Sequence, residues 1–132
     1  MPQYIGHIAL VVDDYDRAIT YYQDILGFEL MEDTVMSETK RWVVMKPSKS
    51  AECSLLLAKA STPEQVSRIG NQTGGRVFLF LYTDDFDQFY ARLIKGNVKI
   101  VRQPSVEAYG KVAVFEDLYG NLWDLLQLNV DH

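Results

Sequence analysis

The stretch Gly6-His7-Ile8-Ala9-Leu10-Val11-Val12-Asp13-Asp14-Tyr15-Asp16 decides the fold of this chain of 132 residues. Its aliphatic and β-branched part is typical of a buried strand, and the two adjacent acids can accept hydrogen bonds from the first N–H groups of a helix. The same pattern returns without a gap as Val77-Phe78-Leu79-Phe80-Leu81-Tyr82-Thr83-Asp84-Asp85-Phe86-Asp87, 71 residues later. A repeat of this kind indicates two copies of one structural unit.

The elements around the two copies follow one order. In the first half the sequence predicts a strand, an amphipathic helix and three further strands, at 5–12, 15–27, 28–31, 41–45 and 53–58. In the second half the same series is predicted at 77–83, 86–96, 98–101, 111–115 and 123–127, and Pro104 is expected to end the strand at 98–101. The predicted fold class is α+β: two βαβββ modules in tandem, forming a curled mixed sheet around a cavity.

We expect residues 1–132 to form a single domain. Module one covers residues 4–60, a linker helix lies within 61–75, and module two covers 76–128. Thr62 can cap the linker helix and Pro63 can begin it, since proline lacks the N–H that the first helical position leaves unpaired.

The composition excludes several functions. The net charge is −5, and no basic cluster alternates with aromatic residues, so we expect neither a nucleic-acid partner nor an anionic membrane surface. No apolar run reaches the ~20 residues of a membrane span. The single cysteine, Cys53, excludes an internal disulfide, and residues 1–5 lack the pattern of a signal peptide. These features predict a cytoplasmic protein whose partner is a small molecule.

Three motifs carry a resemblance to a known family. They are His7-Ile8-Ala9-Leu10-Val11-Val12-Asp13, Tyr21-Tyr22 with Leu26-Gly27-Phe28, and Asp117-Leu118-Tyr119-Gly120-Asn121-Leu122-Trp123-Asp124-Leu125. Over residues 4–128 the chain resembles the glyoxalase/bleomycin resistance protein/extradiol dioxygenase superfamily, also called the vicinal oxygen chelate superfamily. The resemblance implies the two-module fold, a small-molecule ligand and a homodimer.

The resemblance also implies where a metal would bind. Metal enzymes of this superfamily draw ligands from the first and last strands of each module, which here gives His7, Phe78 and Asp124, and Ser54 by an offset of 70. Phenylalanine cannot coordinate a metal, and serine is a poor ligand for divalent ions. A shift of two residues on the fourth strand would offer Glu52, so that His7, Glu52 and Asp124 could hold zinc, nickel or iron. His132, at the chain end, is not expected to be a ligand. We therefore expect no cofactor, with a divalent metal as the alternative.

Several other candidate residues allow two interpretations. His7 and Asp124 can form an acid–base pair, because a carboxylate orients an imidazole, or a buried structural pair. Arg41 can bind an anionic group through two hydrogen bonds, or it can be a charge on an edge strand. Tyr109 can be a gate over the cavity or a plain aromatic residue of a loop. The remaining ligand-contact candidates are Trp42, Ser54, Phe78 and Trp123.

Three functions follow from the resemblance. The first is a binding protein of the bleomycin resistance type that holds an aromatic or anionic small molecule without a complete metal site. The second is a divalent-metal-dependent lyase or isomerase of the glyoxalase type, in which the metal would polarise a substrate oxygen. The third, a ring-cleaving dioxygenase, would need a second histidine at the position of Phe78. Whether the protein is an enzyme is left open.

Overall fold

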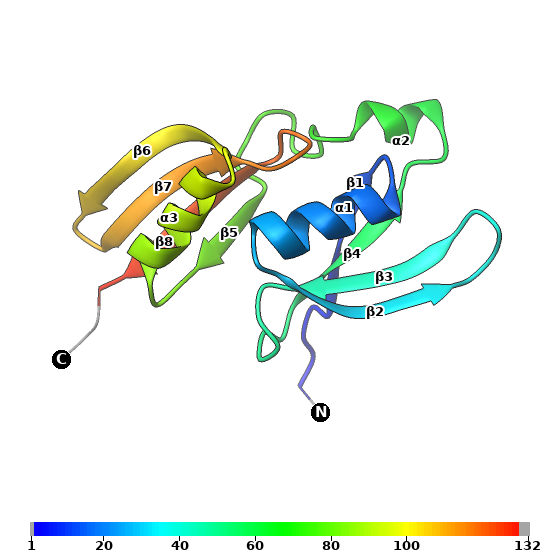
Figure 1. The fold of residues 1–132 in the computed structure, drawn as a ribbon, viewed down its shortest axis with the longest axis horizontal. Coiled ribbons are helices and arrows are strands. Elements are labelled where there is room, and N and C mark those ends of the chain that lie inside the picture. The colour runs from blue at the N-terminus through cyan, green and yellow to red at the C-terminus, as the bar shows by residue number, and fades with distance from the viewer. Residues whose placement is uncertain (1, 130–132) are drawn as a thin grey trace. The chain divides into compact units, whose positions relative to one another are not determined.

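The computed structural model describes residues 2–129, and His132 therefore lies outside the described residues. The chain divides into two compact units, Met1–Ile69 and Gly70–His132. Each unit contains a strand, a helix and then three strands, as the repeat in the sequence predicts (Figure 1). None of the helices in residues 2–129 has the length and apolarity that crossing a membrane requires.

The first unit contains a four-stranded sheet in the order β1-β4-β3-β2. Strands β1 and β4 are parallel, whereas β4, β3 and β2 are antiparallel neighbours. A short π-helical turn, η1, continues the first helix, and Gly27 follows it with a positive φ of 74°. The elements are β1 (His7–Val12), α1 (Tyr15–Thr20), η1 (Tyr21–Ile25), β2 (Glu29–Val35), β3 (Arg41–Lys46), β4 (Ser54–Lys59) and α2 (Pro63–Ser67).

The second unit repeats this topology with the strand order β5-β8-β7-β6, and β5 and β8 are parallel. The caps of the two main helices also correspond. The side chain of Asp14 accepts a hydrogen bond from the Arg17 N–H, and that of Asp85 accepts one from the Gln88 N–H. The elements are β5 (Leu79–Tyr82), α3 (Phe86–Lys95), β6 (Lys99–Glu107), β7 (Gly110–Glu116) and β8 (Leu122–Leu128).

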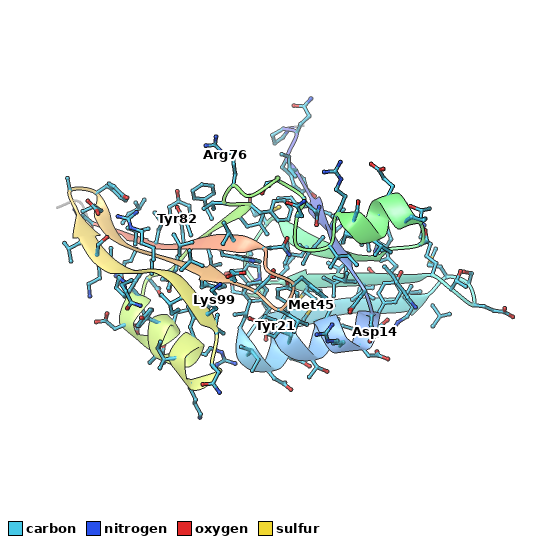
Figure 2. All side chains as sticks on the ribbon, turned by 90° about the horizontal axis from the view of Figure 1, so that it is seen from above. Asp14, Tyr21, Met45, Arg76, Tyr82 and Lys99 are labelled. Carbon is cyan, nitrogen blue, oxygen red and sulfur yellow. The ribbon has the colours of Figure 1, made fainter. Side chains whose placement is uncertain are left out.

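Each sheet has two faces, because successive side chains of a strand point to opposite sides. On the helix face, apolar side chains are buried beneath α1 or α3; Met45, for example, lies between its sheet and α1 (Figure 2). We call the other side the far face. The strand register assigns to it His7, Ala9, Val11, Trp42, Val44, Ser54, Leu56 and Ala58 in the first unit, and Phe80, Tyr82, Arg102, Val112, Val114, Asp124 and Leu126 in the second.

The predicted α+β fold of two βαβββ modules is confirmed, and each module contains one four-stranded mixed sheet. One prediction about the strands needs correction. Strand β6 runs through Pro104, which the sequence suggested as its end. It can do so because β6 is an edge strand, and Pro104 lies at a register irregularity where no ladder donor is needed.

Candidate functional site

His7 lies at the start of β1 on the far face of the first unit. Its Nδ1 is 2.9 Å from the Ser54 hydroxyl, which donates to the Gly6 carbonyl over 3.0 Å. A serine hydroxyl has a single proton, so this arrangement places the imidazole hydrogen on Nδ1 and leaves Nε2 as an acceptor. The Trp42 ring meets the His7 ring edge-on at a centroid distance of 5.7 Å. His7 therefore presents one acceptor next to an aromatic side chain.

The strand register decides which residues of β4 correspond to Asp124. His7 pairs with Ser54, and Glu52 is exposed and precedes the strand, so the alternative register that would offer Glu52 is wrong. The assignment of Ser54 as the counterpart of Asp124 is also wrong. Val43 pairs with Leu57, 14 residues away, whereas Ala113 pairs with Leu125, only 12 residues away.

The turn between β3 and β4 is therefore two residues longer than the turn between β7 and β8. This difference reduces the offset between β4 and β8 to 68, so Asp124 corresponds to Leu56 and Ser54 to Leu122. The first strand of each unit gives the same correspondence. Ala9 and Phe80 correspond at the offset of 71, and Ala9 pairs with Leu56 while Phe80 pairs with Asp124.

Asp124 lies in the middle of the far face of the second unit. Directly across the strands it neighbours Phe80 on β5 and Val114 on β7, and Arg102 lies beyond Val114. No residue among 2–129 forms a hydrogen bond with its carboxylate. Burial raises the pKa of Asp124, and the nearby Arg102 charge opposes this rise only in part. An acid that is partly buried and unpaired is a typical feature of a binding or catalytic site.

Aromatic side chains surround this part of the second unit. Phe80 is 57% and Tyr82 60% exposed on the far face. Figure 2 shows Tyr82 on the side of its sheet away from α3. Phe78 lies just before β5, is half-buried, and donates its backbone N–H to the Leu122 carbonyl. Phe80 is not among the ligand-contact candidates of the sequence analysis, although its alternation with Leu79 and Leu81 is a signal for this position.

Arg41 serves as a structural clamp. Its guanidinium contacts Asp33 at 2.6 Å and Asp16 at 2.9 Å, and it lies over the Tyr15 ring, 5.1 Å from the centroid. The hydrogen bonds that the guanidinium donates to Asp33 raise its pKa further above the usual value.

The second unit contains the same clamp at corresponding positions. Lys111 contacts Asp87 at 2.9 Å and lies over the Phe86 ring. A contact that recurs between the sheet and the helix start in both units belongs to the scaffold. Since Arg41 already binds two carboxylates, the structure favours a structural role for this residue over the binding of an anionic ligand.

Trp123 needs correction as a ligand contact. Its side chain is on the helix face, stacked on Phe115 at 5.8 Å, and it is only 2% exposed. The indole N–H donates to the carboxylate of Asp117, which also accepts hydrogen bonds from Asn121. Trp123 is therefore a core residue that fixes the turn before β8. Tyr109 is half exposed in the turn between β6 and β7, and its role as a gate stays a prediction.

The residues at the implied metal positions do not fit a divalent ion. With the corrected register these positions are His7, Leu56, Phe78 and Asp124, and two of the four side chains cannot coordinate. The two that can coordinate, His7 and Asp124, are one ligand short of the three protein ligands that a catalytic divalent ion usually has. Within residues 2–129 no three His, Cys, Asp or Glu side chains are grouped so that they could hold a metal ion. The pairing of His7 with Asp124 as acid and base stays a prediction.

Comparison with known proteins identifies the family. The model of the Glyoxalase/Bleomycin resistance protein/Dioxygenase superfamily matches residues 4–125. The chain belongs to this superfamily. An uncharacterized protein from Shewanella frigidimarina is 62% identical to this chain over 130 residues, covering 98% of this chain and 96% of its own.

Solved structures agree with this membership. UcmS2 superimposes with a TM-score of 0.81 at 28% identity, over 96% of this chain and 98% of its own. TnmS3, an antibiotic binding protein from Streptomyces sp. CB03234, gives a TM-score of 0.77 at 29% identity, over 97% of this chain and 98% of its own.

Proposed function

We propose that this superfamily member binds a small aromatic molecule that carries a protonated amine, and that it binds this molecule without a metal ion. The observation that carries the proposal is Asp124, a partly buried carboxylate on the far face with a raised pKa and no hydrogen-bond partner among residues 2–129. A protonated amine would supply both the missing donor and the compensating charge. Hydrogen bonds between charged groups contribute about 1.5–3 kcal/mol each.

The neighbouring side chains suit the aromatic part of such a ligand. Phe80 lies beside Asp124 and is 57% exposed, so it offers a free ring face. Aromatic stacking of this kind contributes about 0.5–1.5 kcal/mol beyond the area buried. Since Arg102, a cation on the same far face, is paired with Glu107 at 2.8 Å, the observations favour a cationic ligand over an anionic one at the far face of the second unit.

An antibiotic is the ligand class that the comparisons support. The similarity to TnmS3, an antibiotic binding protein, is 29% identity over nearly the whole chain. We therefore propose that the protein sequesters an aromatic antibiotic and performs no chemistry on it. The glyoxalase-type lyase and the ring-cleaving dioxygenase would both need the metal ligands that Leu56 and Phe78 replace. A homodimer and a cytoplasmic location remain predictions; sedimentation velocity at several concentrations would test the dimer.

Calorimetric titration with doxorubicin, a planar aromatic antibiotic with an amine, tests the proposal. N-acetyl-doxorubicin, in which the amine is neutral, is the matched probe. We expect doxorubicin to bind roughly 10- to 100-fold more tightly than the acetylated compound, and Asp124→Asn to remove most of that difference.

The control variant is Asp87→Asn, which removes a carboxylate that contacts Lys111 on the helix face. It should leave both affinities unchanged. Equal affinity of wild-type protein for the two compounds, or no effect of Asp124→Asn, would overturn the proposal.

A further inference from the structure

The sheet of the first unit contains a notch between β3 and β4. These strands pair only from Val43 to Met45, although β3 begins at Arg41 and β4 continues to Lys59. On their outer sides both strands stay paired to their ends, β3 with β2 and β4 with β1. The strands therefore separate from each other within an otherwise continuous sheet.

The second unit has no such notch. There β7 and β8 pair over seven consecutive positions, from Gly110 to Glu116. One local difference accompanies this contrast. In the first unit the Arg41 N–H donates to the Tyr15 hydroxyl at 3.2 Å, and the residue that corresponds to Tyr15 in the second unit is Phe86, which has no hydroxyl. The notch is therefore specific to the sequence of the first unit and is not required by the fold.

A cavity of about 540 Å³ opens at the notch, a volume sufficient for a small molecule. Its walls combine aromatic and aliphatic side chains with hydroxyl and ammonium groups. They are formed by Tyr15, Thr39, Trp42, Leu56, Ala58 and Lys59, with Lys40, Arg41, Leu57, Ala60 and Ser61 completing the lining.

Two lysines provide the accessible positive charge of this cavity. Lys40 and Lys59 are both exposed, and neither forms an ion pair with another residue in the described part of the chain. Arg41, in contrast, forms ion pairs with both Asp33 and Asp16. Asp14 and Glu38 line a smaller adjoining cavity together with the two lysines, and Asp14 is engaged in capping α1.

We propose that the notch binds an aromatic monoanion, such as an aryl carboxylate. The ring packs against Trp42, Leu56 and Ala58, which share the far face, while the carboxylate contacts the ammonium groups of Lys40 and Lys59. The site is within the first unit, and the inference does not rest on the ligand proposed for Asp124.

Calorimetric titration with 2-naphthoate tests this inference, with the neutral isostere 2-naphthamide as the matched probe. Replacing both lysines, as Lys40→Ala with Lys59→Ala, should weaken 2-naphthoate binding roughly 10-fold, because two partly screened ion pairs are lost. The affinity for 2-naphthamide should not change. Lys49→Ala is the control, since this exposed lysine of the first unit lies outside the cavity lining, and it should leave both affinities unchanged.

A second variant tests the cavity itself. Ala58→Phe places a ring in the notch and should abolish the binding of both probes, while thermal unfolding checks that the variant folds. If 2-naphthoate fails to bind wild-type protein, or binds equally well to the double lysine variant, the inference is wrong. Unchanged binding to a folded Ala58→Phe variant would also overturn it.

Discussion

The two units have the same plan, but their far faces differ in chemistry. The clamp of Arg41, Asp16 and Tyr15 in the first unit recurs as Lys111, Asp87 and Phe86 in the second, with the same contacts between helix and sheet. Several far-face positions differ between the units, because His7 is matched by Phe78 and Leu56 by Asp124. The scaffold contacts have therefore stayed the same in both units, while the side chains available to a ligand have diverged.

The comparison predicts that equivalent core positions of the two units contribute equally to the free energy of unfolding. Leu57 and Leu125 correspond at the offset of 68, and they are 1% and 0% exposed. Replacing either by alanine should lower the free energy of unfolding by about 2–5 kcal/mol, because each deletion leaves a cavity in the helix-face core. Urea unfolding measures this. A loss below about 1 kcal/mol for one variant alone would show that the two cores are not equivalent.

Features that depend on residues close together in the sequence could be predicted. Features that depend on how distant strands pair could not. The offset of 71 relates local patterns of a strand and the helix after it, so the repeat, the caps and the order of elements were correct. The site depended on register, which is set by turn length. A turn longer by two residues between β3 and β4 moved the counterpart of Asp124 from Ser54 to Leu56.

The burial of Trp123 was not predicted either. Trp123 was expected to contact a ligand, yet it lies in the core, where its indole N–H has a buried partner, Asp117. That partner lies six residues earlier, and only the folded turn brings it close to the indole. Phe80, in contrast, is exposed on the far face.

The two clamps should differ in strength. Arg41→Met should lower the free energy of unfolding by about 1 kcal/mol, and Lys111→Met by less, because the Lys111 and Asp87 side chains are 42% and 80% exposed whereas those of Arg41 and Asp33 are 24% and 29% exposed. Chemical denaturation at neutral pH measures both. Equal effects would contradict the comparison.

The loss of stability caused by Arg41→Met should also depend on pH. Hydrogen bonds from Arg41 hold the pKa of Asp33 below its usual range. The resulting stabilisation is complete above the unfolded-state pKa of about 3.9 and is lost as the pH falls through the lower folded-state pKa. The difference between wild-type protein and Arg41→Met should therefore shrink in acid. A difference that stays constant with pH would exclude this ion pair as its cause.

Replacing Asp124 should have a smaller effect on stability, with the opposite sign. Burial raises the pKa of this carboxyl, so its ionised form destabilises the folded state above the folded-state pKa, and the penalty disappears below the unfolded-state pKa. Asp124→Asn should raise the melting temperature at neutral pH by about 1–3 °C and should have no effect below about pH 3.5. Leu56→Asn, at the corresponding position of the first unit, is the control without a titrating group and should show no such pH dependence.

The central claim is that Asp124 binds the cationic group of a ligand and that no metal ion takes part. Calorimetric titration of doxorubicin into wild-type protein, carried out with excess EDTA and again after addition of nickel or zinc, tests this claim most directly. We predict the same affinity and a stoichiometry of one ligand per chain in all three conditions. Binding that is absent in EDTA and restored by the metal would contradict the account.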